Sequence, residues 1–155
     1  MSEFNLSDLV KSEFINLNLR AQTPEGVLRE LVNLFELEEK ARGLLLTMLK
    51  EREKLGSTGV GKGIAIPHCR SLLLPSLSLA IGRSKKGINF KALDKRPVQL
   101  FFLIVAPPQD PYNQYLLTLG KIAQIAKDIS FKDSLFTAET PTDFLARLKE
   151  IEKVT

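Results

Sequence analysis

The sequence is poor in residues that cross-link a fold or bind metals. Its 155 residues include no tryptophan, one cysteine and one histidine. Because a disulfide needs two thiols, the lone Cys69 excludes an internal disulfide and is consistent with a reducing compartment. Cys69 and His68 are also too few for a metal site, which normally takes three or four protein ligands. We therefore expect no metal, and we predict no cofactor.

Long apolar runs are absent as well. The longest stretches, such as 100–106, are far shorter than the ~20 residues that a membrane-spanning helix requires. The first residues, Met1-Ser2-Glu3-Phe4, lack the basic start and the apolar stretch of a secretory signal. We predict no membrane insertion and a cytoplasmic location.

The composition is that of an ordinary globular protein, with 44% hydrophobic and 26% charged residues. A length within roughly 100–200 residues predicts a single domain over 1–155. The formal net charge of +4 permits weak attraction to nucleic acid. However, the basic residues interrupt strand-like segments as solvated turns do, and only one aromatic residue, Phe90, lies among them, so we predict no nucleic-acid binding. These basic residues are Arg83, Lys85, Lys86, Lys91, Lys95 and Arg96.

Four segments have the apolar spacing of helices that bury one face. The first begins at Thr23-Pro24, an N-cap residue followed by proline at the first helical position, and the second extends over about 38–54. A third lies between Pro111 and about residue 126, and a fourth starts at Thr140-Pro141. We expect only a short turn over 131–136.

Strand-like segments alternate with these helices, at 14–19, 64–66, 77–83 and 98–105. The last is almost continuously apolar, which is typical of a strand that is covered on both faces. The alternation predicts an α/β fold: a single domain with a mixed sheet sandwiched by helices on both faces.

A glycine-rich stretch, Gly56-Ser57-Thr58-Gly59-Val60-Gly61-Lys62-Gly63, precedes the only histidine, and we name it the glycine segment. It holds too many glycines for a regular helix, so we expect a loop that leads into the strand 64–66. Its spacing also matches a nucleotide-binding P-loop, but Gly63 stands where a serine or threonine would bind magnesium. A charged helix end, rather than a buried strand, comes before it, which further disfavours nucleotide hydrolysis.

His68 follows the strand 64–66 and Pro67. A lone histidine is more often a packing or surface residue than a reactive one. Here Pro67 fixes the backbone, the short strand provides a rigid mount, and the glycine segment leaves backbone N–H groups able to face an anion. These neighbours favour a reactive His68.

The glycine segment and the following Ile64-Ala65-Ile66-Pro67-His68 resemble the active-site signature of the mannitol- and fructose-type enzyme IIA domains of the bacterial phosphotransferase system. The Gly-Ser-Thr-Gly start is most similar to the nitrogen-regulatory branch of this family. The match is ungapped. The helix end Glu51-Arg52-Glu53, the segment 91–100 that leads into the strand 98–105 and the helix 116–126 are also family-like, so the resemblance spans nearly the whole chain. It implies a phosphocarrier for sugar transport or its regulation, which accepts a phosphoryl group on His68 from a histidine-containing phosphocarrier protein.

The chemistry suits a histidine, because an imidazole with a pKa near 6.5 is largely neutral at pH 7 and presents a lone pair to phosphorus. The resemblance also places Arg52, sixteen residues before His68, at the position of an active-site arginine. Its planar guanidinium can hold two phosphoryl oxygens, although it can equally serve as an exposed cation at a helix end. Ser57 and Thr58 can donate hydroxyl hydrogen bonds to the same group, but both are also common in loops. Lys62 is expected to be a solvated residue.

One position departs from the family pattern. Members usually carry a second histidine near the start of the helix after the strand 98–105, and this chain has Tyr115 there. A phenol donates a hydrogen bond but carries no positive charge at neutral pH. Two functions therefore stay open: an active phosphocarrier, or a non-catalytic or weakly phosphorylated regulatory module that docks to a transporter or a sensor kinase.

Overall fold

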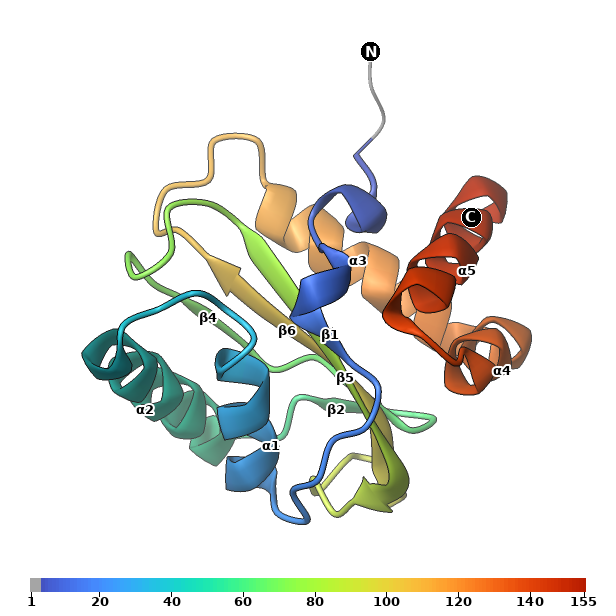
Figure 1. Ribbon diagram of the computed structural model, residues 1–155, viewed down its shortest axis with the longest axis horizontal. Coiled ribbons are helices and arrows are strands. Elements are labelled where there is room, and N and C mark those ends of the chain that lie inside the picture. The colour runs from blue at the N-terminus through green and yellow to red at the C-terminus, as the bar shows by residue number, and fades with distance from the viewer. Residues whose placement is uncertain (1–3) are drawn as a thin grey trace.

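A six-stranded mixed sheet forms the centre of the computed structural model, which describes residues 4–155 and, at residue 129, the backbone alone. Five strands follow one another across the sheet, and a sixth, β4, pairs with β6 beyond the end of β3 (Figure 1). In that order they are β1 (Ile15–Asn16), β5 (Ser78–Ile88), β6 (Val98–Ala106), β3 (Ile64–Ala65) and β2 (Gly59–Gly61), with β4 at His68–Arg70.

Strands β3 and β4 lie along the same edge of β6 and run parallel to it. Ile64 is paired with Leu100 and His68 with Ile104, and the Ile104 N–H donates to the carbonyl of Pro67 between them. The chain from Ile64 to Arg70 is therefore one interrupted strand. Because both strands run parallel to β6, His68 lies near the carboxyl end of the sheet's central strand.

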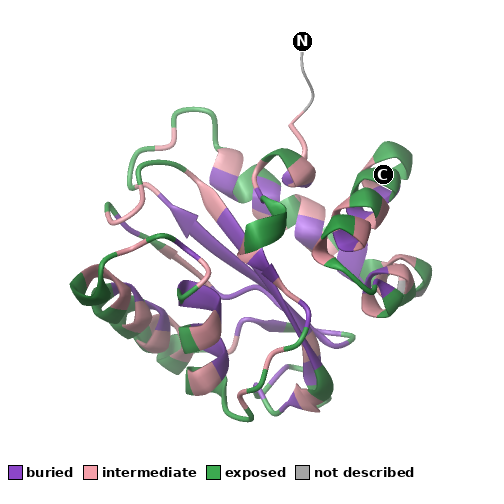
Figure 2. Ribbon diagram, in the orientation of Figure 1, coloured by how far each residue is buried: buried purple, intermediate pink, exposed green. Residues whose placement is uncertain are grey.

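Helices cover both faces of the sheet, as the sequence predicts (Figure 1). On one face lie α1 (Pro24–Val32) and α2 (Glu39–Leu55). On the other lie α3 (Gln114–Lys127), α4 (Ile129–Thr137) and α5 (Pro141–Val154). Two short 3-10 helices, Leu6–Asp8 and Ser12–Phe14, lie on this second face as well. Alternate residues of β6 enter two separate cores, Phe101 and Leu103 toward α1 and α2, and Phe102 and Ile104 toward α3 and α5. The strand is buried almost throughout (Figure 2), which confirms the expectation from its apolar run.

The two predicted Thr-Pro helix starts are confirmed. Thr23 accepts a hydrogen bond from the Gly26 N–H at 3.1 Å, and Thr140 accepts one from the Asp143 N–H at 3.0 Å. In both helices the proline occupies the first turn, where no intrahelical N–H is required. Within residues 4–155, no helix combines the length and the apolar character needed to cross a bilayer.

Three local predictions are wrong. Of the expected strand 14–19, only Ile15 and Asn16 form β1, because Phe14 belongs to a 3-10 helix and the Asn18 N–H donates to the Asn16 side chain at 2.9 Å. The expected turn over 131–136 is part of helix α4. The glycine segment is only partly a loop, since it contains β2, which forms a tight hairpin with β3. Gly59 fits there because a Cβ atom on it would lie 2.7 Å from the Cβ of Ala92.

Candidate functional site

His68 is the first residue of β4 and is half-buried. Side chains alternate between the two faces of a strand. Ile66 lies in the core beneath α3 and Cys69 packs against the opposite core. His68 and Arg70 therefore share the face that α3 covers, and His68 stands between the end of α2 and the start of α3.

One hydrogen bond fixes the His68 ring. Its Nδ1 lies 2.7 Å from the carbonyl oxygen of Ile66. Because a carbonyl oxygen only accepts, Nδ1 carries the proton and the lone pair lies on Nε2. Nε2 makes no hydrogen bond to any of residues 4–155. Burial lowers the pKa of His68, and the nearby Arg52 charge lowers it further, while the Ile66 hydrogen bond opposes both effects. The ring is thus neutral at pH 7 with a free ring nitrogen.

Arg52 lies in the last turn of α2, close enough to His68 to affect its protonation. Its Nη1 donates to the carbonyl of Gly56 at 2.8 Å. This bond holds the guanidinium against the start of the glycine segment. Arg52 is thus held near enough to His68 for its positive charge to act on the ring.

Ser57 and Thr58 use their hydroxyl groups to shape the glycine segment. The Ser57 hydroxyl donates to the Phe90 carbonyl at 2.6 Å and accepts from the Gly59 N–H at 3.0 Å. Both the hydroxyl and the N–H of Thr58 donate to the carboxylate of Glu53, whose pKa is raised by burial. The two residues thus tie the segment to α2 and to residue 90, next to Arg52.

Tyr115 lies in the first turn of α3 beside His68. The two ring centres are 5.8 Å apart, with their planes inclined by 57°. The Tyr115 N–H donates to Asp110 at 2.7 Å, which fixes the start of the helix over the site. Burial raises the pKa of Tyr115, so its hydroxyl remains a neutral hydrogen-bond donor. This hydroxyl makes no hydrogen bond within the described part of the chain. Every buried polar side-chain atom in that part has a partner, so the hydroxyl oxygen is not fully buried and reaches solvent.

Arg70 lies beside this group, although it was not among the predicted site residues. The Arg70 guanidinium carbon lies 4.6 Å from the centre of the Tyr115 ring, and Nη1 donates to the Pro107 carbonyl at 3.1 Å. The missing signal was the strand period of two, which places residues 68 and 70 on one face. The strand predicted from the sequence ends at Ile66, two residues before His68.

Two other residues near His68 in sequence lie elsewhere. Lys62 is in the β2–β3 turn, at the far end of β6, and its Nζ donates to the Lys127 carbonyl at 2.9 Å. Cys69 faces the core beneath α1 and α2, where burial raises the pKa of its thiol to about 11. In the part of the chain from residue 4 onward, no three metal-ligating side chains come together.

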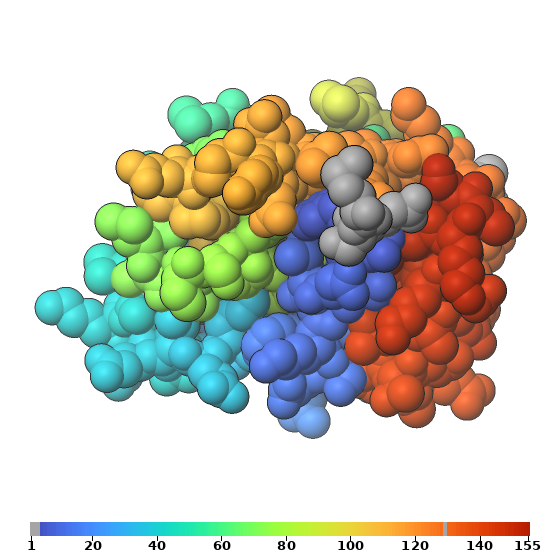
Figure 3. Space-filling model, turned by 90° about the horizontal axis from the view of Figure 1, so that it is seen from above, coloured from blue at the N-terminus to red at the C-terminus, as the bar shows by residue number. Residues whose placement is uncertain are grey.

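The surface around the site is formed by segments that are distant in sequence. Seen from above, the residues after β4, in green, lie beside the connection between β6 and α3, in orange (Figure 3). The Arg70–Pro107 hydrogen bond joins these two segments. The site therefore borders the connection between β6 and α3.

Residues 8–151 match the family model described as "Phosphoenolpyruvate-dependent sugar phosphotransferase system, EIIA 2". The chain is 36% identical to a nitrogen regulatory protein of Pseudomonas aeruginosa, over 80% of this chain and 81% of that protein. It is 28% identical to the fructose-specific EIIABC component of Bacillus subtilis, over 96% of this chain. The chain spans only 24% of the length of that component.

A solved structure is also similar, that of the nitrogen regulatory protein IIA-Ntr from Neisseria meningitidis. It superposes with a TM-score of 0.83 at 29% sequence identity, covering 92% of this chain and 98% of the other.

Proposed function

Because the chain belongs to the enzyme IIA type 2 family of the phosphoenolpyruvate-dependent sugar phosphotransferase system, we propose that it accepts a phosphoryl group on Nε2 of His68. Membership makes it a phosphotransferase component. The hydrogen bond from Nδ1 to Ile66 supports the finer assignment, since it leaves Nε2 as the only ring nitrogen with a lone pair. We place the reaction in the cytoplasm.

The phosphoryl donor is a histidine-containing phosphocarrier protein. The Nε2 lone pair forms the new N–P bond while the N–P bond of the donor breaks, and the donor imidazole leaves with that electron pair. The proton on Nδ1 of His68 stays in place, held by Ile66. Phosphoryl transfer of this kind needs alignment and charge stabilisation more than acid or base catalysis.

The remaining predicted residues act on the phosphoryl oxygens or on the segment that faces them. Arg52 supplies positive charge beside His68 and has donors left beyond the one bound to Gly56. The Tyr115 hydroxyl is available as a neutral donor. Ser57 and Thr58 contribute by fixing the glycine segment beside Arg52, with their hydroxyl groups bonded to the Phe90 carbonyl and the Glu53 carboxylate.

One observation favours a second candidate, a weakly phosphorylated regulatory module that docks to a transporter or a sensor kinase. Tyr115 is neutral, so the residue beside His68 lends no charge to phosphohistidine. The relatives include a fructose-specific component and a nitrogen regulatory protein, so either candidate can act in sugar transport or in nitrogen regulation.

The test is labelling with the phosphorylated carrier, followed by intact-mass measurement before and after acid treatment. Wild-type protein should gain one acid-labile phosphate, and His68→Ala should gain none, because His68 is the only histidine. Cys69→Ala is the matched control, since its side chain faces the other core, and it should be labelled like the wild type. Equal labelling of His68→Ala would overturn the assignment. An unlabelled wild type that still binds a partner would favour the docking module.

A further inference from the structure

Arg70 has more hydrogen-bond donors than the fold uses. Of its five N–H groups, one binds the Pro107 carbonyl at 3.1 Å, and no other hydrogen bond of its side chain occurs among the described residues. It also forms no ion pair with a carboxylate anywhere in residues 4–155. An exposed strand position therefore presents an unneutralised charge with free donors, two residues from His68.

The Tyr115 ring determines where this charge is held. The guanidinium carbon lies 4.6 Å from the ring centre, and the same ring lies 5.8 Å from the centre of the His68 ring. A guanidinium over an aromatic face is attracted to the ring and keeps its in-plane N–H groups accessible. The stack therefore holds the Arg70 donors at the edge of the His68 site.

The two arginines reach the site from different elements. Arg52 comes from the end of α2 and is bonded to Gly56. Arg70 comes from β4 itself and is packed on the first turn of α3. A phosphoryl group bound near Nε2 carries close to two negative charges at pH 7, which a neutral tyrosine does not offset.

We propose that Arg70 binds the phosphoryl group as it passes to His68, and that it supplies the second positive charge of the site. This inference rests on the proposed function. The in-plane N–H groups of Arg70 donate to phosphoryl oxygens while Nε2 forms its bond to phosphorus and the bond to the donor nitrogen breaks. Tyr115 acts as the platform on which the guanidinium lies.

The experiment measures the second-order rate constant of phosphorylation with two donors. One is the phosphorylated carrier protein, and the other is phosphoramidate, a small molecule whose P–N bond breaks with release of ammonia. Arg70→Gln should be about ten- to a hundred-fold slower with both, the range expected for a lost charged hydrogen bond. Arg70→Lys should recover part of the rate, because lysine restores the charge without the planar fork.

Arg96→Gln is the matched control, since it removes the same charge from an exposed residue at the other end of β6. It should keep the wild-type rate of phosphorylation. The midpoint of thermal unfolding should be the same in every variant as in the wild type. A further comparison uses Tyr115→Phe, which keeps the ring and removes only the hydroxyl. Arg70→Gln should cost the same factor in that background, whereas a role limited to orienting the hydroxyl predicts no further loss.

The outcomes separate the two proposals. A wild type that neither donor labels overturns the phosphocarrier function itself. If the wild type is labelled and Arg70→Gln reacts equally fast, only the role of Arg70 is overturned. A loss seen with the carrier protein but absent with phosphoramidate would make Arg70 a docking contact, and would also refute binding of the phosphoryl group.

Discussion

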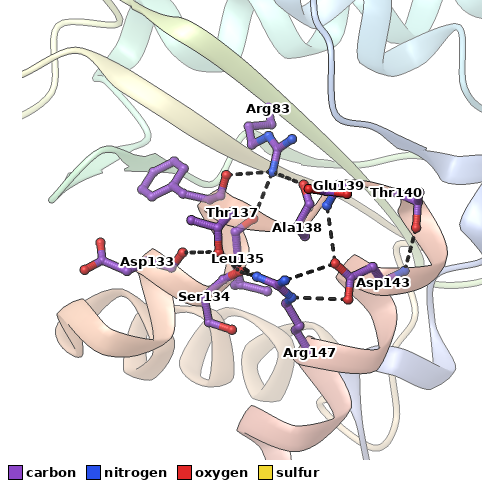
Figure 4. A network of polar contacts seen from close by, with 11 residues as sticks. Arg83, Asp133, Ser134, Leu135, Thr137, Ala138, Glu139, Thr140, Asp143 and Arg147 are labelled. Atoms are coloured by element: carbon purple, nitrogen blue, oxygen red, sulfur yellow. Dashed lines mark hydrogen bonds and ion pairs between the residues drawn. The ribbon is translucent and has the colours of Figure 1, made fainter.

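Two arginines on strands of the same sheet differ in how much of their bonding capacity the fold uses. Arg83 on β5 is only 6% exposed, and its Nη1 lies 3.1, 2.8 and 2.7 Å from the carbonyl oxygens of Leu135, Phe136 and Ala138 (Figure 4). Arg70 on β4 is exposed and binds one carbonyl. The comparison teaches that the number of unused N–H donors, rather than the residue type, distinguishes an arginine that can bind a ligand from one that stabilises the fold.

The region around Arg83 is an internal anchor for the carboxyl end of helix α4. The last carbonyls of a helix have no intrahelical partner, and here Arg83 supplies one from the sheet. A second arginine, Arg147 of α5, donates at 2.6 Å to both the Ser134 carbonyl and the Thr137 hydroxyl, and it is ion-paired with Asp143 (Figure 4). This region holds α4 and α5 in place and is far from His68.

The largest effect should follow from replacing Arg83. Arg83→Met keeps the apolar stem but removes the donor to the Leu135, Phe136 and Ala138 carbonyls, two of which lie in buried bonds, so the free energy of unfolding should fall by about 3 kcal/mol. Urea denaturation measures this loss. The labelling rate of the folded protein should not change, because the anchor does not touch the site.

Arg147→Met provides the comparison for that experiment. Its side chain is 32% exposed, so water can replace part of what is lost, and we expect a decrease of about 1 kcal/mol. If Arg147→Met costs as much as Arg83→Met, burial does not distinguish the two arginines. A slower labelling rate in either variant would show that the two regions are coupled.

A smaller effect is expected at the helix caps. Thr140→Ala removes the acceptor for the Asp143 N–H next to the anchor, and should lower the free energy of unfolding by about 1 kcal/mol. Thr23→Ala removes the equivalent bond to Gly26 at the start of α1 and should cost about the same. A markedly larger loss for Thr140→Ala would mean that the cap and the Arg147–Asp143 pair act together. Thermal or urea unfolding of both variants decides this.

The sequence predicted the parts of the fold that depend on local chemistry. Both Thr-Pro starts and the doubly buried β6 are where the pattern placed them. By contrast, β2 and the Arg83 anchor depend on residues far apart in the chain: Gly59 packs on Ala92, and Arg83 bonds to Ala138. Such contacts have no periodic signal in a single sequence.

The site divides in the same way. His68 and Arg52 were predicted because the family signature fixes their spacing, and Tyr115 because it breaks the pattern. Arg70 was not predicted, since its contact with Tyr115 forms only when α3 lies against β4. The hydroxyl bonds of Ser57 and Thr58 to Phe90 and Glu53 also required coordinates.

The smallest expected effect is the pH dependence of stability that comes from His68, whose ring resists protonation in the folded protein. Burial and the Arg52 charge lower the pKa of His68 below its ordinary value near 6.5. As pH falls, the unfolded chain therefore takes up this proton before the folded one does. The contribution of His68 to stability is complete above pH ~6.5, decreases as pH drops toward the folded pKa, and is constant below it.

Because the chain has one histidine, its NMR titration is unambiguous. The Cε1–H resonance of His68 should report a midpoint below that of a histidine in a short peptide. The difference in unfolding free energy between wild type and His68→Gln should change with pH only below pH ~6.5, in favour of the wild type as pH rises. This subtraction removes the opposite effect of Glu53, whose raised pKa acts in both proteins. A midpoint at or above the peptide value would mean that the Ile66 hydrogen bond outweighs burial and the Arg52 charge, and that the folded site does not favour the neutral ring.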